Sequence, residues 1–91
     1  MQYLVCYDIA DDPRRDRMSR TLLDFGRRIQ ESVFLATLDN ELVGLMKERA
    51  SKVLDESEDT LHIFPICDAC AKRAEAYGRA ALPVDRDFYI V

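Results

Sequence analysis

Residues 3–12 read YLVCYDIADD. This stretch contains the first expected element of the fold and a carboxylate, Asp8, that could be part of a functional site. The apolar run from Gln2 to Ile9 has the length of one strand and is typical of a central strand buried on both faces. Asp8 interrupts this run, because Ile9 and Ala10 follow it. Its carboxylate is either an early loop residue or a functional group at a strand end, and residue spacing alone leaves both interpretations open.

A helix is predicted directly after this strand. Asp12 can cap its N-terminus, and Pro13 occupies the first helical position, where its missing N–H group costs nothing. Gly26 is expected to end the helix in the left-handed conformation. After this helix a strand is predicted over residues 28–38, and a second strand directly after Leu38 is left open. The later elements are predicted as a helix over 39–57 capped by Asp39 or Asn40, a strand over 58–66 with Pro65 at an edge or bulge, a short helix over 67–78 and a closing strand over 86–91.

This alternation of strands and helices predicts an α+β fold, a ferredoxin-like βαββαβ sandwich with a short C-terminal strand. We expect a single domain over residues 1–91, with its core over about 1–78 and a C-terminal strand extension over about 79–91. In such a fold the helices cover one face of the sheet. Tyr7 and Phe34 are candidates for the bare face, which a second copy of the chain would cover in a homodimer. Tyr7 is expected to point away from the neighbouring Asp8, into the core or the interface.

Charge is distributed unevenly along the chain, although the net charge is only −4. Residues 14–28 contain six Arg and two Asp, whereas residues 39–59 contain seven acidic and three basic residues. A basic patch on one helix can hold phosphate groups, and Arg suits bidentate phosphate contacts; a solvated helix face is the alternative. The chain has no apolar stretch of about 18 residues and no basic leader, so a cytoplasmic protein without a membrane segment is expected.

Three cysteines are present, and two of them form the CxxC sequence of Cys67 and Cys70. A zinc site would need Cys6 and His62 as further ligands, with Cys6 reaching out of the first strand. A redox role like that of thioredoxin needs a CxxC between a strand and a helix, and the preceding LHIFPI is compatible with it. The favoured interpretation is that the cysteines are small buried apolar residues.

Asp8 is placed where ligands collect in α/β sheets, at the carboxyl end of a strand and just before a helix N-terminus. One carboxylate alone is a poor site for Mg²⁺. If a dimer axis passed near the first strand, two copies of Asp8 would approach each other, and a divalent cation could join them. Without such an axis, Asp8 is a loop residue or an additional helix cap.

Three segments in this order, YLVCYDI, DPRRDRMSRTLLDFGRRIQESVF and EDTLHIFPIC, resemble the CRISPR-associated endoribonuclease family, the small second core protein of CRISPR adaptation. The resemblance covers about the first 70 residues. Its parts are YD[IV] at the end of the first strand, an arginine-rich helix ending in FG, a [RK][IV]QxSVF strand and a late DxxxIxP strand. Leu35 stands where many members carry Glu, and the CxxC resembles a structural variation of some members.

The resemblance implies a ferredoxin-like homodimer and a metal-dependent nuclease that acts on RNA or DNA. Asp8 would be the catalytic and metal-binding residue, with Mg²⁺ shared between the two copies. The remaining expected site residues are Arg14, Arg15, Arg17 and Arg28 for nucleic-acid binding, of which Arg14 rests on the charge pattern, and Tyr7 and Phe34 as supporting residues. The implied partner is the adaptation integrase, with which the chain would bind duplex DNA for spacer acquisition. The alternatives are a catalytically silent DNA-binding adaptor and a toxin-like ribonuclease of the same fold.

Overall fold

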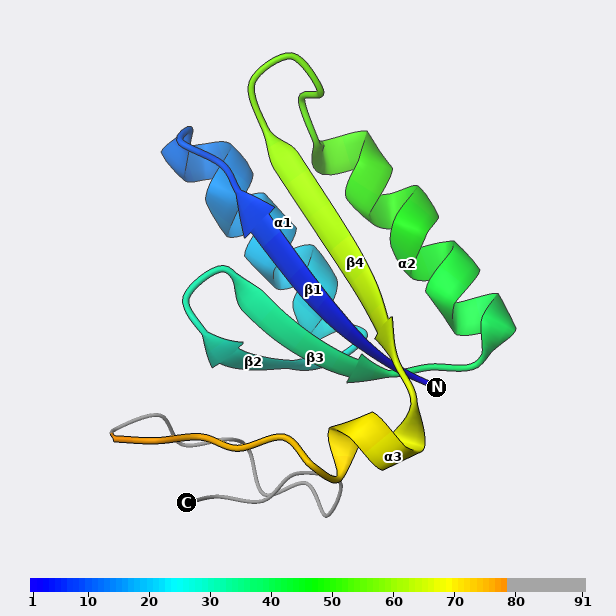
Figure 1. Cartoon of the computed structure of the whole chain (residues 1–91). Coiled ribbons are helices and arrows are strands. Elements are labelled where there is room, and N and C mark those ends of the chain that lie inside the picture. The colour runs from blue at the N-terminus through cyan, green and yellow to red at the C-terminus, as the bar shows by residue number, and fades with distance from the viewer. Residues whose placement is uncertain (79–91) are drawn as a thin grey trace.

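The computed structural model describes residues 1–78, which form a four-stranded antiparallel sheet and three helices (Figure 1). In the sheet the strands lie in the order β2-β3-β1-β4. The elements along the chain are β1 (Gln2–Asp8), α1 (Asp12–Leu23), β2 (Arg27–Gln30), β3 (Val33–Thr37), α2 (Asn40–Val53), β4 (Thr60–Ile66) and α3 (Asp68–Ala71). This is the predicted ferredoxin-like βαββαβ order. The strand expected over residues 86–91 and the extension over 79–91 lie outside the described residues.

β1 lies inside the sheet, where its backbone pairs with β3 on one side and with β4 on the other. Val5 is opposite Phe34 of β3 and Ile63 of β4, so the three side chains lie on one face of the sheet. α1 and α2 cover this face. The core between them consists of Val5, Tyr7, Ile9, Met18, Leu22, Phe34, Ala36, Leu38, Val43, Met46 and Ala50.

The prediction of one strand over residues 28–38 is wrong, because β2 and β3 form a hairpin there. The possible strand directly after Leu38 is also wrong, because α2 begins at Asn40. The chain reverses at Ser32, whose φ of 63° is in the left-handed region. Sequence patterns reveal such a turn through Gly or Asn, and Ser32 gives no such signal. Two helices are also shorter than predicted: α2 ends at Val53 and α3 at Ala71. Pro65 lies in β4, at an edge of the described sheet, as predicted.

The ends of α1 differ from the prediction in two residues. Asp11, not Asp12, is the N-cap, and its carboxylate accepts a 3.0 Å hydrogen bond from the backbone N–H of Arg14. Gly26 is not a left-handed cap, since Ser32 and Gly78 alone have positive φ within residues 1–78. Gly26 is required for a different reason: a Cβ atom there would lie 2.3 Å from the carbonyl oxygen of Leu35. Backbone contact with β3 therefore excludes any side chain at Gly26.

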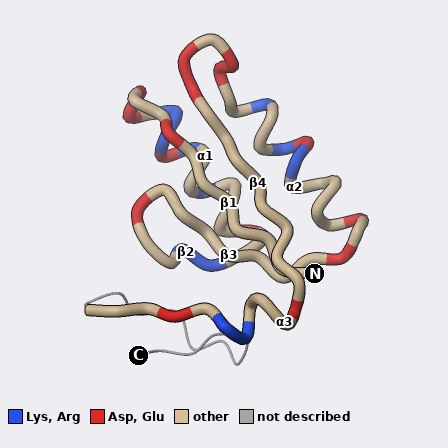
Figure 2. The backbone as a smooth tube through the Cα atoms, viewed as in Figure 1, with Lys and Arg blue, Asp and Glu red and all other residues tan. Residues whose placement is uncertain are grey.

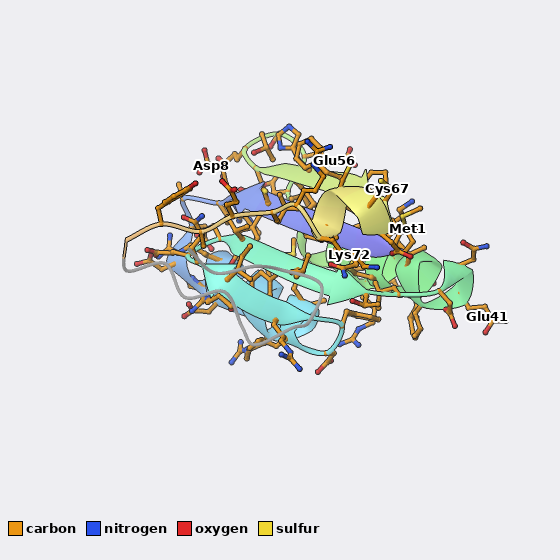
Figure 3. The ribbon with its side chains drawn as sticks, turned by 60° about the horizontal axis from the view of Figure 1, so that its bottom comes forward. Met1, Asp8, Glu41, Glu56, Cys67 and Lys72 are labelled. Carbon is orange, nitrogen blue, oxygen red and sulfur yellow. The ribbon has the colours of Figure 1, made fainter. Side chains whose placement is uncertain are left out.

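The expectation that Tyr7 and Phe34 lie on the bare face is wrong, because both are buried beneath the helices, with exposed fractions of 5% and 1%. Strand alternation places a different apolar set on the opposite face: Leu4, Cys6, Val33, Leu35 and Phe64. Figure 3 shows α3 and the segment after it in front of the sheet. Ala71 of α3 is fully buried but does not belong to the core under α1 and α2.

Candidate functional site

Asp8 is the last residue of β1 and is paired in register with Thr60 of β4. Because Tyr7 faces the helices, strand alternation directs Asp8 to the opposite face. The carboxylate is exposed and has no hydrogen bond or ion pair within residues 1–78. Figure 3 shows it at the far end of the sheet from Met1 and Cys67. The structure therefore has a carboxylate at a strand end whose oxygen atoms are available to a ligand.

The available oxygen atoms of Asp8 fit one half of a magnesium site. Mg²⁺ commonly takes one or two protein carboxylates and completes its shell with water and substrate phosphate oxygens. No group of three or more His, Cys, Asp or Glu side chains suited to a metal ion occurs in the described part of the chain. Residues 1–78 of one chain therefore contain no complete set of protein ligands around Asp8.

Arg15 contacts the loop that follows the Asp8 strand end. Its guanidinium donates to the carbonyl oxygens of Ile9 and Ala10 at 3.1 and 3.4 Å, and it forms an ion pair with Asp12. The hydrogen bond to Asp12 is the main cause of a raised pKa of Arg15. This side chain holds a positive charge over the loop that follows Asp8.

Arg14 is used differently, because its guanidinium is clamped by acidic residues before β4. It donates to the two carboxylate oxygens of Asp59 at 2.5 and 2.9 Å and to Glu58 at 3.3 Å. The Asp59 side chain is fully buried, and it also accepts the backbone N–H of Asp55 at 2.9 Å. The hydrogen bond from Arg14 lowers the pKa of Asp59. These contacts balance the charge of Arg14 and weigh against a phosphate contact by this residue.

Arg17 and Arg28 provide the more accessible positive charge. Arg17 is exposed on α1, and its side chain has no hydrogen bond or ion pair within residues 1–78. Arg28 on β2 donates to the hydroxyl of Ser19 at 3.1 Å and lies 5.8 Å from the centre of the Phe34 ring. Figure 2 shows the basic residues along α1 and β2 and the acidic residues between α2 and β4. Arg28 lies on the helix side of the sheet, so a single chain does not bring it together with Asp8.

Tyr7 and Phe34 support the strand end by packing. Their ring centres are 6.1 Å apart with 26° between the ring planes, and both rings are buried. The backbone N–H of Tyr7 donates to the carbonyl oxygen of Ser32 at 3.1 Å, which ties the end of β1 to the hairpin turn. These contacts fix the position of the neighbouring Asp8, and any direct role of Tyr7 or Phe34 stays a prediction.

Asp59 is the residue of this region that sequence reasoning missed. It stands at the start of the DxxxIxP pattern, but the charge pattern of the sequence distinguishes it from none of the other acidic residues of 39–59. Its signal was its place directly before an apolar strand, where a buried carboxylate requires a cation. That cation, Arg14, is 45 residues away in the chain.

Comparison with known proteins gives one family and several relatives. The family model for CRISPR associated protein Cas2 matches residues 1–74. The CRISPR-associated endonuclease Cas2 2 of Thermus thermophilus is 37% identical over 98% of this chain and 94% of that protein. The CRISPR-associated endoribonuclease Cas2 1 of Chloroflexus aurantiacus is 32% identical over the full length of both chains.

Two solved structures have the same fold. Streptococcus pyogenes Cas2, crystallised at pH 6.5, superposes with a TM-score of 0.78 at 25% identity, over 86% of this chain and 100% of that chain. A hypothetical protein from Thermus thermophilus gives a TM-score of 0.71 at 41% identity, over 72% of this chain and 80% of that chain.

None of the helices in residues 1–78 is long and apolar enough to cross a bilayer.

Proposed function

Because the chain belongs to the Cas2 family of CRISPR-associated proteins, as its sequence predicted, we propose that it is a metal-dependent nuclease of CRISPR adaptation. The active form is a homodimer in which Asp8 of each copy binds one shared Mg²⁺ ion. The substrate is RNA or DNA, since relatives are named both endoribonucleases and endonucleases. The observation that carries this proposal is the exposed carboxylate of Asp8 at the end of β1, which has no hydrogen bond or ion pair in the described residues 1–78.

The homodimer is supported by the face of the sheet that bears Asp8. Phe64 of β4 is 49% exposed on this face, and His62 stacks against it with 5.9 Å between ring centres. β4 is also an edge strand of the described sheet, so its outer backbone groups face away from β1. A second copy that covered this face would bury Phe64 and bring a second Asp8 toward the first.

The residues have separate tasks in this proposal. Asp8 supplies carboxylate oxygens, and the bound cation would polarise the scissile phosphate and lower the pKa of an attacking water. Arg17, which has no ion pair among the residues that the structure describes, provides a positive charge for phosphate oxygens of the substrate backbone. Arg15 holds the loop after Asp8 in place through the carbonyl groups of Ile9 and Ala10.

The test is a nuclease assay on RNA and DNA with Mg²⁺ or EDTA, using wild type, Asp8→Ala and Asp8→Asn. Loss of the metal ligand should lower the cleavage rate roughly a hundredfold or more, as expected when several kcal/mol of transition-state stabilisation disappear. Glu41→Ala is the matched control, because Glu41 is an exposed acid in the first turn of α2, far from Asp8 (Figure 3). Cleavage by Asp8→Ala at the wild-type rate would contradict the nuclease proposal.

A second candidate function is a DNA-binding adaptor for the adaptation integrase, without catalysis. The observation that favours it is the run of basic residues along α1 and β2 (Figure 2), of which Arg28, paired with the buried Phe34, lies on the helix side of the sheet, away from the face of Asp8. Spacer acquisition in cells separates the two functions. Normal acquisition by Asp8→Ala together with failure of Arg15→Ala/Arg17→Ala favours the adaptor, and normal acquisition by both variants contradicts DNA binding through these arginines.

A further inference from the structure

Cys67 and Cys70 form a cluster that the proposed nuclease does not use. Both thiols are free and exposed, which contradicts the interpretation of these two cysteines as small buried apolar residues. Cys6, by contrast, is half-buried in β1, and burial raises its pKa. The exposed pair therefore differs from Cys6 in access and in chemistry.

The zinc set considered from the sequence is not assembled in this structure. Cys6 and His62 are opposite each other in the middle of the β1–β4 pair. Cys67 follows the end of β4, five residues beyond His62, which corresponds to about 16 Å along an extended strand. No group of three metal-ligating side chains occurs within residues 1–78. Within residues 1–78, the CxxC pair therefore has no third metal-ligating side chain grouped with it.

The local backbone brings the two thiols over the same helical turn. Cys67 is the N-cap of α3, with extended φ and ψ of −68° and 156°, and Cys70 is the third residue of the helix. The Sγ atom of Cys67 accepts the backbone N–H of Cys70 at 3.3 Å. Side chains in an N-cap and third-residue pair approach each other, as a short intramolecular disulfide requires.

The two thiols are not equivalent. The backbone N–H of Cys70 lowers the pKa of Cys67, and the thiol of Cys70 acts in the same direction. The neighbouring thiol of Cys67 raises the pKa of Cys70. A more acidic, exposed thiol attacks, and a neighbouring thiol that keeps its proton longer resolves the product.

We propose that Cys67 and Cys70 form a thiol–disulfide exchange site that takes small-molecule disulfides of the glutathione class. The Cys67 thiolate attacks one sulfur of the small disulfide, forms a mixed disulfide and releases one thiolate. Cys70 loses its proton and attacks the sulfur of Cys67, which closes the Cys67–Cys70 disulfide and releases the second thiolate. The two thiolates take up the two protons of the protein thiols, so the protein pair is oxidised by two electrons and the small disulfide is reduced to two thiols.

This site is independent of the nuclease proposal. Asp8 ends β1, whereas Cys67 lies beside the start of β1 at the other end of the sheet (Figure 3). The disulfide closes a four-residue loop at the start of α3, whose Ala71 is fully buried. Oxidation therefore fixes the turn by which the chain leaves β4.

The test uses the full chain, reduced and then equilibrated with set ratios of reduced to oxidised glutathione. Remaining thiols are alkylated and located by mass spectrometry of the intact protein and its peptides. The expected result is a joint loss of the Cys67 and Cys70 thiols with a Cys67–Cys70 linked peptide, while Cys6 stays reduced as an internal control. Addition of a reductant should restore both thiols.

The variants Cys70→Ser and Cys67→Ser test the order of attack. Cys70→Ser should accumulate a mixed disulfide with glutathione on Cys67, roughly tenfold faster than Cys67→Ser accumulates one on Cys70. Circular dichroism of both exposed-site variants verifies that they are folded. Equal trapping rates, no linked peptide at any glutathione ratio, or a tightly bound zinc ion that protects both thiols would each overturn the proposal.

Discussion

Tyr7 carries a buried hydroxyl group that has no protein hydrogen-bond partner within residues 1–78. A buried, unsatisfied hydroxyl costs desolvation free energy, so Tyr7→Phe should leave the stability unchanged or raise it by up to about 1 kcal/mol. Urea unfolding of the two proteins measures this difference. A supporting role of the hydroxyl in cleavage would instead lower the nuclease rate of a variant with intact stability. A clear loss of stability in Tyr7→Phe would contradict the structural assignment.

The Arg14–Asp59 pair makes stability depend on pH. Arg14 lowers the pKa of the buried Asp59 below its ordinary value of 3.8, so the folded state holds this carboxylate charged more readily than the unfolded state does. The contribution is fully present above the unfolded pKa and is lost as pH falls through the lower, folded pKa. The free energy of unfolding should therefore decrease below about pH 4, where acid titration of carboxylates begins.

Removal of Arg14 tests the origin of this pH dependence. Arg14→Ala leaves a buried carboxylate without its cation, so the variant should unfold at a clearly lower urea concentration at pH 7, and its stability should change less between pH 7 and acid. Arg17→Ala is the matched control, since Arg17 is exposed and without an ion pair in the described region. Equal losses of stability in both variants would show that the clamp on Asp59 is not what stabilises this end of α1.

Two glycines show how elements are joined and what each position permits. A Cβ atom at Gly26 would meet the backbone of β3 at 2.3 Å, whereas one at Gly44 in α2 would meet nothing within 4 Å. Gly26→Ala should therefore destabilise the protein by about 1–3 kcal/mol through overpacking. Gly44→Ala should stabilise it by about 0.5–1 kcal/mol, because Ala favours a helix interior. Thermal unfolding of the pair measures both, and equal effects would contradict the close contact of the Gly26 backbone with β3.

Elements with strong local signals were predictable from the sequence. The apolar run of β1 is a strand pattern, and the DDP sequence at the start of α1 is a helix-start pattern. Only the capping residue was predicted wrongly, as Asp12 in place of Asp11. The β2–β3 hairpin was not predictable in this way, because its turn depends on Ser32 in the left-handed region. Gly26 was recognised as special, but the reason, contact with a strand about ten residues later, depends on tertiary packing.

At the scale of the whole molecule, the sequence located Asp8 at a strand end but could not place the arginines around it. Arg14 and Asp59 are in patches of opposite charge, and nothing local indicates that they neutralise each other across 45 residues. The pairing register of a strand likewise decides which of its side chains face the helices, and a shift of one residue would exchange the faces of Tyr7 and Asp8. The surface opposite the helices became definable only with the register of β1 and β4.

The proposed sharing of one metal ion between two chains predicts a specific dependence on mixing. If each active site needs Asp8 from both copies, then in an equal, fully exchanged mixture of wild type and Asp8→Ala only about a quarter of the dimers keep both carboxylates. The cleavage rate should then fall to about a quarter of that of wild type at the same total protein, and vary with the square of the wild-type fraction.

Nuclease rates over a series of mixing ratios measure this dependence, after incubation long enough for subunits to exchange. Wild type mixed with Glu41→Ala should keep its full rate, because Glu41 is an exposed acid of α2 that is remote from Asp8. A rate that falls in proportion to the wild-type fraction would mean that each chain cleaves by itself. That result would contradict the two-carboxylate site, and the single Asp8 of one chain would then have to bind the metal ion with water and phosphate oxygens alone.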